Sequence, residues 1–267
     1  MKAMNNAKDI SVVVTTYNNP GFLELVLQAL ERQRVLPGEV IVADDGSGEE
    51  TRQLIERHKK LMPVPLVHSW IPDEGFRVAK SRNIAVAKAR GNYIILLDGD
   101  IVVTPDFVAD HLRLMQPGRL VTGSRARLGE KATRRHVAEK NAHITFWTRG
   151  LGRRLVMLHA PWLNGLFSHR DVLRRARSCH MAFFRDDFLA VNGFEEKFIG
   201  WGYEDSEFVQ RLFNHGLHRW NAKLMASAVH LYHKSSPTNR SEENMALLQQ
   251  TINEHRKRAE LGVDQYL

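Results

Sequence analysis

Two aspartates interrupt an otherwise apolar stretch near the middle of the chain. In NYIILLDGDIVVTP, residues 92–105, Asp98 and Asp100 follow five apolar or aromatic residues and precede three more apolar ones. Gly99 between them allows a close backbone turn, so both carboxylates can face one cation. Mg2+ and Mn2+ take oxygen ligands and leave positions for water or phosphate oxygens. The spacing therefore indicates a site for a metal and a diphosphate, while the alternative, a polar turn, stays open on spacing alone.

The elements that must position these acids alternate regularly through the first hundred residues. Strands are predicted where β-branched and apolar residues run together, and helices where apolar residues recur every three or four positions. This alternation predicts an α/β fold with a mostly parallel central sheet flanked by helices. The predicted strands are ISVVVTTY, GEVIVADDGS, PLVHSW and NYIILLDGD, and the predicted helices are PGFLELVLQALERQ, EETRQLIERHKK and VAKSRNIAVAKAR.

The ends of these strands carry polar side chains. Thr15, Asp44, Asp45, Asp98 and Asp100 all stand at predicted strand ends. Ligands of parallel sheets bind beyond the carboxyl ends of the strands. The topology therefore brings these five residues to one edge of the sheet, and this favours a metal site over a simple turn at the two aspartates.

The second half of the chain is less regular. Residues 127–178 mix aromatic residues, glycines and arginines, and we interpret them as an excursion from the sheet. Glycines after the helical patterns, Gly193 and Gly216, are typical of helix ends. Further along, CHMAFFRDDFLAVNGF predicts a strand and a short helix, EDSEFVQRLFNHG a helix, NAKLMASAVHLYHK a strand and SEENMALLQQTINEHRKRAEL a surface helix.

Length and composition predict a globular protein. The 267 residues are 43% hydrophobic, which is enough for a sizeable core. Neither an apolar run long enough for a membrane span nor a secretory signal pattern is evident in the sequence. The single cysteine, Cys179, excludes an internal disulfide and a cysteine-rich metal cluster, which suits a reducing compartment. We therefore expect a cytoplasmic protein.

Positive charge is concentrated in one segment. The net charge is +8, yet residues 113–177 hold fifteen Lys or Arg and three acidic residues, a local excess of twelve. A basic surface of this kind can serve nucleic acid, anionic lipid headgroups or phosphorylated substrates, or have no partner at all. Charge alone leaves these alternatives open.

Several ordered motifs together resemble the family 2 glycosyltransferases. SVVVTTYNNPGFLELVLQALERQ, EVIVADDGSGEET and GFRVAKSRNIAVAKARGNYIILLDGDIVVTPDF look like the nucleotide-sugar half of that family, with the glycosyltransferase A fold. NGFEEKFIGWGYEDSEFVQRLFNHG resembles the galactosyltransferase-like acceptor half of bacterial chondroitin polymerase and of polypeptide N-acetylgalactosaminyltransferases. The resemblance implies a single domain with a donor subregion at 8–126, an acceptor and catalytic subregion at 127–235, and a helical tail at 236–267.

The resemblance also implies a donor site. Thr15 and Asp45 match the positions that contact the uracil and ribose of a UDP-sugar in the family, with Asp44 as a neighbour. In GFRVAKSRN, the segment that borders the nucleotide in relatives, cationic and polar side chains can face a diphosphate. The residues of this segment that we expect to bind the donor are Arg77, Lys80, Arg82 and Asn83.

The metal site is implied in the same way. Asp98 and Asp100 match the family's Asp-x-Asp motif, with Asp100 the more direct ligand of Mn2+ or Mg2+ and Asp98 also near the ribose and the sugar. A histidine after a late strand completes the site in relatives. Here AVHLYHKSSP supplies His230 and His233, and the sequence leaves open which of the two binds the metal.

GWGYEDSEF, residues 200–208, is expected to form the catalytic and acceptor side. In the resembling families the aspartate of the Glu-Asp pair takes the proton of the acceptor hydroxyl, which implies Asp205 as the general base. Glu204 is then expected to hydrogen-bond a sugar, and Trp201 and Gly202 to contact the acceptor. The alternative is an acidic helix start stabilised by the helix dipole alone.

One departure from the family stands just before this region. Cys179 and His180 occupy the place where relatives carry small residues and asparagine. This departure leaves it open whether His180 contacts the donor or the acceptor.

Together these features predict a metal-dependent inverting glycosyltransferase, of the hexosyltransferase type, that uses a UDP-sugar. The expected acceptor is a hydroxyl of a glycan or an anionic glycolipid in bacterial cell-surface polysaccharide or lipopolysaccharide synthesis, with peripheral contact to the inner face of the plasma membrane. Three rivals remain: a nucleotidyltransferase, a basic nucleic-acid-binding module, and an inactive sugar-binding relative. The first lacks its Gly-rich phosphate loop after the first strand, and strand-end acids disfavour nucleic acid. The third would be expected to lack one of the acidic motifs.

Overall fold

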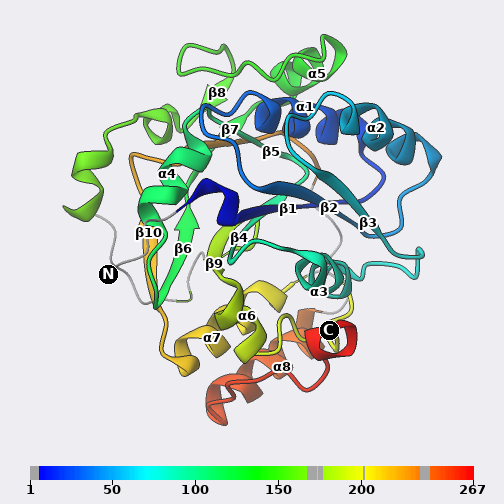
Figure 1. Cartoon of the computed structure of the whole chain (residues 1–267), viewed down its shortest axis with the longest axis vertical. Helices are drawn as coiled ribbons and strands as arrows, with labels where there is room; N and C mark the ends of the chain where they lie inside the picture. Colours follow the sequence, from blue (N-terminus) through cyan, green and yellow to red (C-terminus); the bar gives the residue numbers. More distant parts are fainter. Residues whose placement is uncertain (1–5, 167–172, 174–176, 201, 235–240) are drawn as a thin grey trace.

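A twisted seven-stranded sheet organises the computed structural model, which describes residues 6–166, 173, 177–200, 202–234 and 241–267 (Figure 1). The strand order is β10-β6-β9-β4-β1-β2-β3, and only β9 runs antiparallel to its neighbours among these seven strands. The predicted α/β class with a mostly parallel sheet is therefore confirmed. The strands are β1 (Ile10–Thr16), β2 (Glu39–Asp44), β3 (Leu66–Trp70), β4 (Tyr93–Asp98), β6 (Arg119–Gly123), β9 (His180–Phe184) and β10 (His218–Ala222).

Helices cover both faces of this sheet. Apolar residues of α1, α2 and α4 join the core cluster on one face, and those of α3, α6 and α7 join the cluster on the other. Figure 1 shows α5 and α8 at opposite ends of the molecule. The helices are α1 (Pro20–Glu31), α2 (Glu49–Lys59), α3 (Val78–Lys88), α4 (Phe107–Leu114), α5 (Glu130–Ala138), α6 (Arg185–Ala190), α7 (Glu204–His215) and α8 (Ser241–Asn253).

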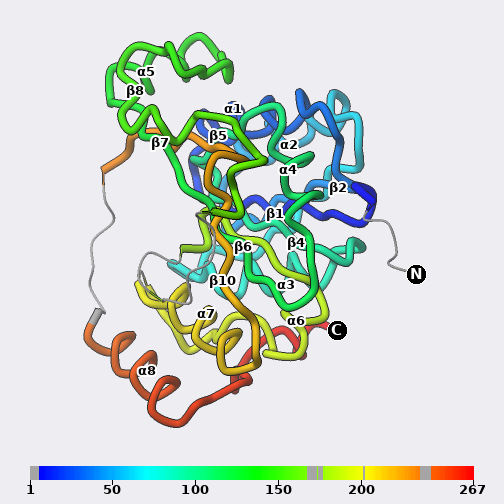
Figure 2. The backbone as a smooth tube through the Cα atoms, turned by 90° about the vertical axis from the view of Figure 1, so that its left-hand side faces the viewer, coloured from blue at the N-terminus to red at the C-terminus, as the bar shows by residue number. Residues whose placement is uncertain are grey.

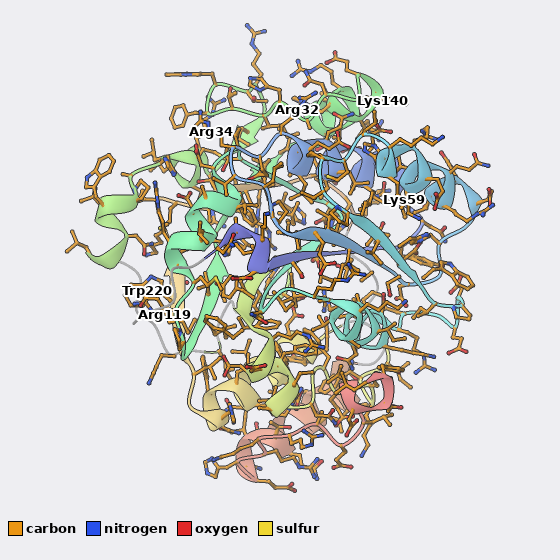
Figure 3. The ribbon with its side chains drawn as sticks, viewed as in Figure 1. Arg32, Arg34, Lys59, Arg119, Lys140 and Trp220 are labelled. Atoms are coloured by element: carbon orange, nitrogen blue, oxygen red, sulfur yellow. The ribbon has the colours of Figure 1, made fainter. Side chains whose placement is uncertain are left out.

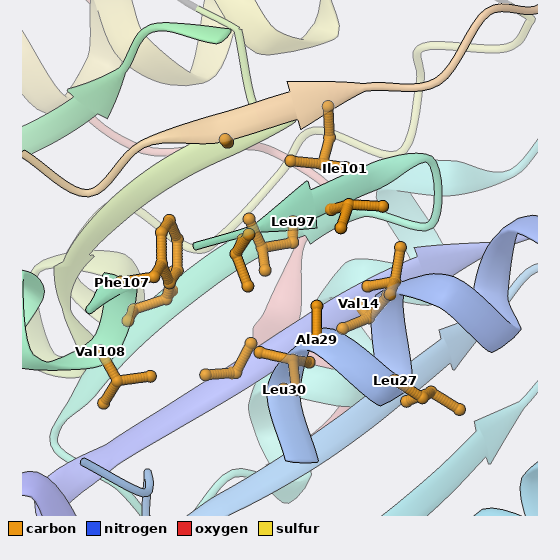
Figure 4. Close-up of a cluster of buried hydrophobic side chains, with 14 of the residues drawn as sticks. Val14, Leu27, Ala29, Leu30, Leu97, Ile101, Phe107 and Val108 are labelled. Carbon is orange, nitrogen blue, oxygen red and sulfur yellow. The ribbon is translucent and has the colours of Figure 1, made fainter. Parts of the chain in front are cut away.

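The apolar composition of the central strands follows from this two-sided burial. Successive side chains of a strand point to opposite faces, so a strand covered on both sides needs apolar residues at nearly every position. In β1, Val12 and Val14 enter the cluster with α1, while Val13 enters the cluster with α3. Figure 4 shows Val14 and Leu97 packed near Leu30 of α1 in the first of these clusters.

A smaller sheet holds the segment that leaves the main sheet after β4. Its order is β5-β11-β7-β8, with β11 antiparallel to β5 and parallel to β7. Figure 2 shows these strands grouped near α5, at the end of the molecule opposite α8. Because β5 starts three residues after β4 ends, this sheet begins directly at the Asp-x-Asp motif. Its strands are β5 (Ile101–Val103), β7 (Arg125–Leu128), β8 (Leu151–Gly152) and β11 (Ala228–His230).

The single strand predicted for NAKLMASAVHLYHK is wrong. Its first residues end β10, and a turn then separates β10 from β11. Leu224 and Ala226 have positive φ angles of 60° and 45°, and the amide of Ala226 donates to the buried carboxylate of Asp110 at 2.7 Å. β10 itself, missed from the sequence, lies at the sheet edge beside β6, with the guanidinium of Arg119 3.9 Å from the ring centre of Trp220 (Figure 3).

Two further expectations need correction. The irregular segment at 127–178 contains a regular helix, α5, whose buried side chains include Ala132 and Thr133. The helix predicted for the C-terminal segment ends at Asn253, and His255 follows with a φ of 50°. In the part of the chain that the structure describes, we find no helix with the length and apolarity that crossing a bilayer requires.

A buried histidine joins α1 to α2. His58 of α2 lies with Nδ1 2.5 Å from Glu31 and Nε2 3.2 Å from Glu24, both on α1. When carboxylates bind both ring nitrogens, each nitrogen must carry an N–H donor. Only the protonated imidazole has two such donors. Burial alone would lower the pKa of His58, but the hydrogen bonds and charges of Glu31 and Glu24 outweigh it, so the pKa is raised above 6.5.

This geometry predicts a pH-dependent contribution to stability. Because the folded state binds the proton more tightly, the stabilisation is fully present below the ordinary pKa of 6.5 and is lost as the pH rises through the raised folded pKa. We expect His58→Gln to lower the free energy of unfolding by about 2 kcal/mol at low pH, and less as the pH rises. Urea unfolding at a series of pH values measures this, with the exposed His143→Gln as the control. A difference that stays constant with pH would contradict the assignment.

Candidate active site

One buried arginine joins the two acidic motifs. Arg82 of α3 donates from Nη2 to Asp98 at 3.1 Å and from Nη1 to Asp205 at 3.3 Å, and Nη1 lies 3.9 Å from Glu204. Its guanidinium also lies 5.1 Å from the ring centre of Phe194. Burial works against the charge of Arg82, but the three carboxylates outweigh it and raise its pKa. Sequence reasoning expected Arg82 to face the donor; the structure shows it as the link between the end of β4 and the start of α7.

Asp98 faces β1 and Arg82. Its Oδ1 accepts from the hydroxyl of Thr15 at 2.9 Å, because β1 and β4 are parallel and pair Thr15 with Asp98 in register. Burial raises the pKa of Asp98, and Asp100 and Asp205 add to this, while Arg82 and the hydroxyl oppose it. Thr15 and Asp98 thus form one polar corner at the carboxyl ends of the central strands, where the sequence predicted it.

The Glu-Asp pair opens α7 beneath a strained turn. Gly202 and Tyr203 have φ angles of 118° and 68°, so the chain enters the helix through the left-handed region. Asp205 is fixed from two sides, by Arg82 and by the amide of Ser178, which donates to Oδ2 at 3.0 Å. Burial, followed by the charge of Asp205, raises the pKa of Glu204 to about 8. A carboxyl that keeps its proton at neutral pH is poorly suited to accept another, which disfavours Glu204 as the base of the pair.

Asp100, His230 and His233 meet at the start of the smaller sheet. Asp100 Oδ2 lies 3.3 Å from His230 Nε2 and 2.9 Å from His233 Nε2, and the three ligand atoms lie within 4.8 Å of one another. The other carboxylate oxygen, Oδ1, is buried without a partner. Burial of Asp100 is outweighed by the two histidines, which lower its pKa, and the hydrogen bond to Asp100 raises the pKa of His233 to about 9.

These three side chains fit a divalent cation. An unpaired buried oxygen and two imidazoles turned to one point form a mixed oxygen and nitrogen ligand set. Both histidines lie close enough to take part, so the structure brings together the two candidates that the sequence left open. Asp98, predicted as a further ligand, is instead engaged by Thr15 and Arg82.

The two acids at the end of β2 have different environments. Asp44 is fully buried, and its oxygens accept from the amide of Ser47 and bond His68 Nε2, each at 2.8 Å. Asp45 accepts from the amide of Arg77 at 2.9 Å, and its other oxygen is buried without a partner. Burial raises the pKa of Asp45 to about 6. Asp45 is thus the acid with a carboxylate oxygen left unpartnered, while Asp44 bonds within the loop that follows β2.

The remaining residues predicted to bind the donor, in α3 and just before it, also lie in different environments. Lys80 is half-buried, lies 3.3 Å from Glu74, and lines a cavity of about 180 Å3 together with Arg77. Asn83 is fully buried and faces Phe194, exchanging two hydrogen bonds of 2.8 Å with its backbone. Its amide is therefore turned away from the strand ends, and the structure gives it the task of fixing the 194–196 turn beneath Arg82.

The structure also shows where Cys179 and His180 lie, the two residues at which the sequence departs from the family pattern. His180 is buried in the core, with Nε2 2.9 Å from His111 Nε2, and Gly123 leaves room for its ring. Burial lowers the pKa of His180 to about 3. His180 thus lies among core side chains rather than on the surface of the site. Cys179 contacts the guanidinium of Arg125, and burial raises the pKa of its thiol.

One contributor to the site was missed because it comes from the C-terminal helix. Asn244 of α8 is buried and donates to the carbonyl of Gly202 at 3.1 Å. It therefore holds the turn before α7. A lone asparagine in a polar helix carries no sequence signal for such a task. Trp201, the predicted acceptor platform, lies outside the described residues.

Comparison with known proteins decides the family. The profile described as Glycosyl transferase family 2 matches residues 11–187, and the one described as N-terminal domain of galactosyltransferase matches residues 167–234. The chain belongs to glycosyltransferase family 2. The predicted family resemblance is thereby confirmed, and the second match covers the Glu-Asp pair and both histidines of the cation site.

Named relatives of this family 2 chain include polysaccharide synthases. It is 25% identical to chondroitin synthase of Escherichia coli over 89% of its own length and 36% of the relative's. It is 27% identical to hyaluronan synthase of Pasteurella multocida, over 87% of its own length and 25% of the relative's. It is 30% identical to validoxylamine A glucosyltransferase of Streptomyces hygroscopicus subsp. limoneus, over 78% of its own length and 48% of the relative's. The chain thus spans about a quarter to a half of the relatives it matches.

Solved structures confirm the glycosyltransferase A fold. Staphylococcus aureus TarS 1-349, in complex with UDP-GlcNAc, superposes with a TM-score of 0.66 at 16% identity, over 96% of this chain and 69% of that one. A mannosyltransferase from Pyrobaculum calidifontis, in complex with GDP-Man and Mn2+, superposes with a TM-score of 0.53 at 19% identity, over 92% of this chain and 62% of that one. At these identities the likeness concerns the fold alone.

The central position of Arg82 yields a prediction. Arg82→Met leaves Asp98 and Asp205 without their shared cation, and we expect a loss of about 2–4 kcal/mol in the free energy of unfolding, because both carboxylates keep some contact with solvent. Arg82→Lys should lose less, since it keeps the charge without the fork. Chemical unfolding at pH 7 measures both. Arg52→Met, which breaks an exposed pair with Glu49, is the control and should change stability little; an equal loss there would contradict a special role for Arg82.

Proposed function

We propose that this family 2 chain is a metal-dependent inverting glycosyltransferase. It transfers a sugar from a nucleotide-sugar, a UDP-sugar in the first place, to a hydroxyl of a glycan or glycolipid acceptor in bacterial cell-surface polysaccharide or lipopolysaccharide synthesis. The observation that carries the proposal is the single guanidinium of Arg82 that binds both Asp98 and Asp205. A donor group at the strand ends and an acceptor group at α7 would thereby meet across one residue.

The donor side rests on the strand ends. Thr15, Asp45 and Asp98 line the carboxyl ends of β1, β2 and β4, where ligands of such sheets bind. The unpartnered buried oxygen of Asp45 suits a ribose hydroxyl or a base N–H, which would satisfy it. The TarS complex with UDP-GlcNAc supports a uridine donor in this fold. The sugar itself is left to experiment.

The cation would be held by Asp100, His230 and His233. Two imidazoles depart from the all-oxygen set that Mg2+ favours, so we prefer Mn2+, and the Mn2+ complex of the Pyrobaculum calidifontis mannosyltransferase supports this choice. When bound, the cation supplies electrostatic stabilisation of the departing nucleoside diphosphate.

Asp205 would act on the acceptor. Its two oxygens are each anchored once, by Arg82 and by the amide of Ser178, and each keeps a lone pair for an acceptor hydroxyl. This anchoring fixes the carboxylate toward the strand ends, as a general base requires. Inversion follows when the hydroxyl attacks the anomeric carbon from the side opposite the leaving diphosphate. Glu204, protonated at neutral pH, is suited to donate a hydrogen bond to a sugar oxygen.

The rival functions lose support. The family match disfavours a nucleotidyltransferase, and four acids gathered around Arg82 and the histidines disfavour a nucleic-acid backbone at this site. An inactive sugar-binding relative would be expected to lack one of the two acidic motifs, and both are in place. The predicted cytoplasmic location, with contact to the inner face of the plasma membrane, stays a prediction.

The role of Asp205 can be tested directly. We expect Asp205→Asn to lower the turnover number by about 100-fold to 10,000-fold, because the amide cannot accept the proton, while UDP still binds. Transfer measured by released UDP and binding by calorimetry separate the two effects. Asp186→Asn, which removes an exposed acid from the first turn of α6, is the matched control and should change neither. Equal loss of transfer and UDP binding in Asp205→Asn would overturn the assigned role.

Metal dependence gives a second test. EDTA should abolish metal-dependent turnover across a panel of UDP-sugars, and Mn2+ should restore it with the true donor. His230→Ala and His233→Ala should each raise the Mn2+ concentration needed for half-maximal activity, because each removes one nitrogen ligand. His143→Ala, an exposed histidine outside the cluster, serves as the control. Full activity in EDTA would refute the cation site.

A further inference from the structure

Large apolar side chains lie open to solvent along the segment after α5. Within residues 147–166, Trp147 and Trp162 are 80% and 79% exposed. Isolated exposed apolar residues are ordinary, but several in one segment mark a contact surface. We call residues 140–166 the apolar basic segment. Its other strongly exposed apolar side chains are Leu155, Leu158 and Leu166, which are 71%, 44% and 75% exposed.

The same segment has a one-sided charge. Between 140 and 166 the sequence contains four Lys or Arg and not one Asp or Glu. Arg149 and Arg153 are exposed and stand two residues along the chain from the open side chains of Trp147 and Leu155. Indole rings with cationic neighbours suit the boundary between lipid headgroups and acyl chains, because the ring prefers the interface and the cation prefers anionic headgroups.

The apolar basic segment lies next to the cation site. His230 of β11 pairs with Arg127 of β7, and Arg127 pairs with Gly152 of β8, which belongs to the segment. Neighbouring strands are about 4.8 Å apart, so β8 runs about 10 Å from the strand of His230. Side chains that pair across strands share a face, and exposed Arg127 therefore continues the positive charge toward the site.

We propose that the apolar basic segment docks the protein on an anionic lipid bilayer, with Trp147 and Trp162 at the headgroup level and the arginines against the lipid phosphates. Docking in this way would hold β11, which carries His230, about 10 Å from β8 of the docked segment. The binding itself does not depend on the proposed sugar transfer, and it concerns the segment rather than the basic charge of the whole chain. Charge complementarity selects lipid over an apolar protein groove, and the exposed leucines select it over nucleic acid.

Vesicle binding by the intact chain tests the proposal. We expect co-sedimentation with phosphatidylglycerol vesicles, weaker binding to pure phosphatidylcholine, and release by salt through screening. Trp147→Ala with Trp162→Ala, and separately Arg149→Glu with Arg153→Glu, should each lower the partition coefficient by at least about tenfold. Circular dichroism and thermal unfolding establish that each variant is folded.

Matched controls come from α2 and the residues that follow it. Lys59→Glu with Lys60→Glu makes the same change of charge at the end of α2, where Lys59 is labelled on the right of Figure 3, and Leu61→Ala removes an equally open apolar side chain. Both should bind vesicles like the unchanged protein. Equal losses in controls and segment variants would reduce the effect to net charge and overturn the proposal.

Fluorescence quenching locates the contact. Phosphatidylcholine brominated on its acyl chains, mixed with phosphatidylglycerol, should quench the protein's tryptophan emission, and Trp147→Phe with Trp162→Phe should bind but lose most of this quenching. Unaltered quenching in that variant, or no vesicle binding at all, would refute the docking surface. A change of oligomeric state in the Trp→Ala variant, without vesicle binding, would show instead that the segment joins two copies of the chain. UDP binding measured in parallel keeps a failure here distinct from a failure of the proposed transfer.

Discussion

The ion pairs of Arg82 are the constraint on which the site depends. A guanidinium removed from water is costly unless carboxylates surround it, and here they come from two places far apart in the sequence, the end of β4 and the start of α7. The planar fork of arginine can bond two carboxylates at once, which a lysine cannot do with the same geometry. Two core residues position the guanidinium of Arg82. Asn83 fixes the backbone of Phe194, and the ring of Phe194 lies against the guanidinium. The buried pair of Glu207 and Arg211 holds α7 to the same turn, with Arg211 donating to the carbonyl of Gly193.

The sheet order explains why one antiparallel strand is useful. β9 runs against β4 and β6, so its first residues, not its last, lie at the edge where β1, β2 and β4 end. This brings Ser178 and Cys179 to the site from the opposite chain direction, and the amide of Ser178 reaches Asp205.

Much of this arrangement could be predicted from the sequence, for physical reasons that differ by region. Strands β1, β2 and β4 are buried on both faces, and helices α1 and α2 carry an apolar stripe, so the parallel core and its polar edge follow from periodicity and topology. Asp44 and Asn83 show the limit: each has the residue type of a ligand, but packing turns its side chain to His68 or to Phe194. The break between β10 and β11 could not be predicted from local sequence, because it depends on a buried carboxylate, Asp110, more than a hundred residues away.

The turn held by Asp110 has a consequence for the cation site. Because Ala226 is fixed to Asp110, β11 begins at Ala228 and pairs with β5 in the register that sets His230 opposite Ile101. A shift of that register by one residue would turn the histidine to the other face of the smaller sheet and away from Asp100. His233 lies beyond the strand, and the backbone between them is held separately, since the amide of Tyr232 donates to the hydroxyl of Thr133 on α5. The two histidines therefore reach one carboxylate through two independent anchors. One of these anchors belongs to the helix that precedes the apolar basic segment, so the smaller sheet and α5 connect the cation site to that surface.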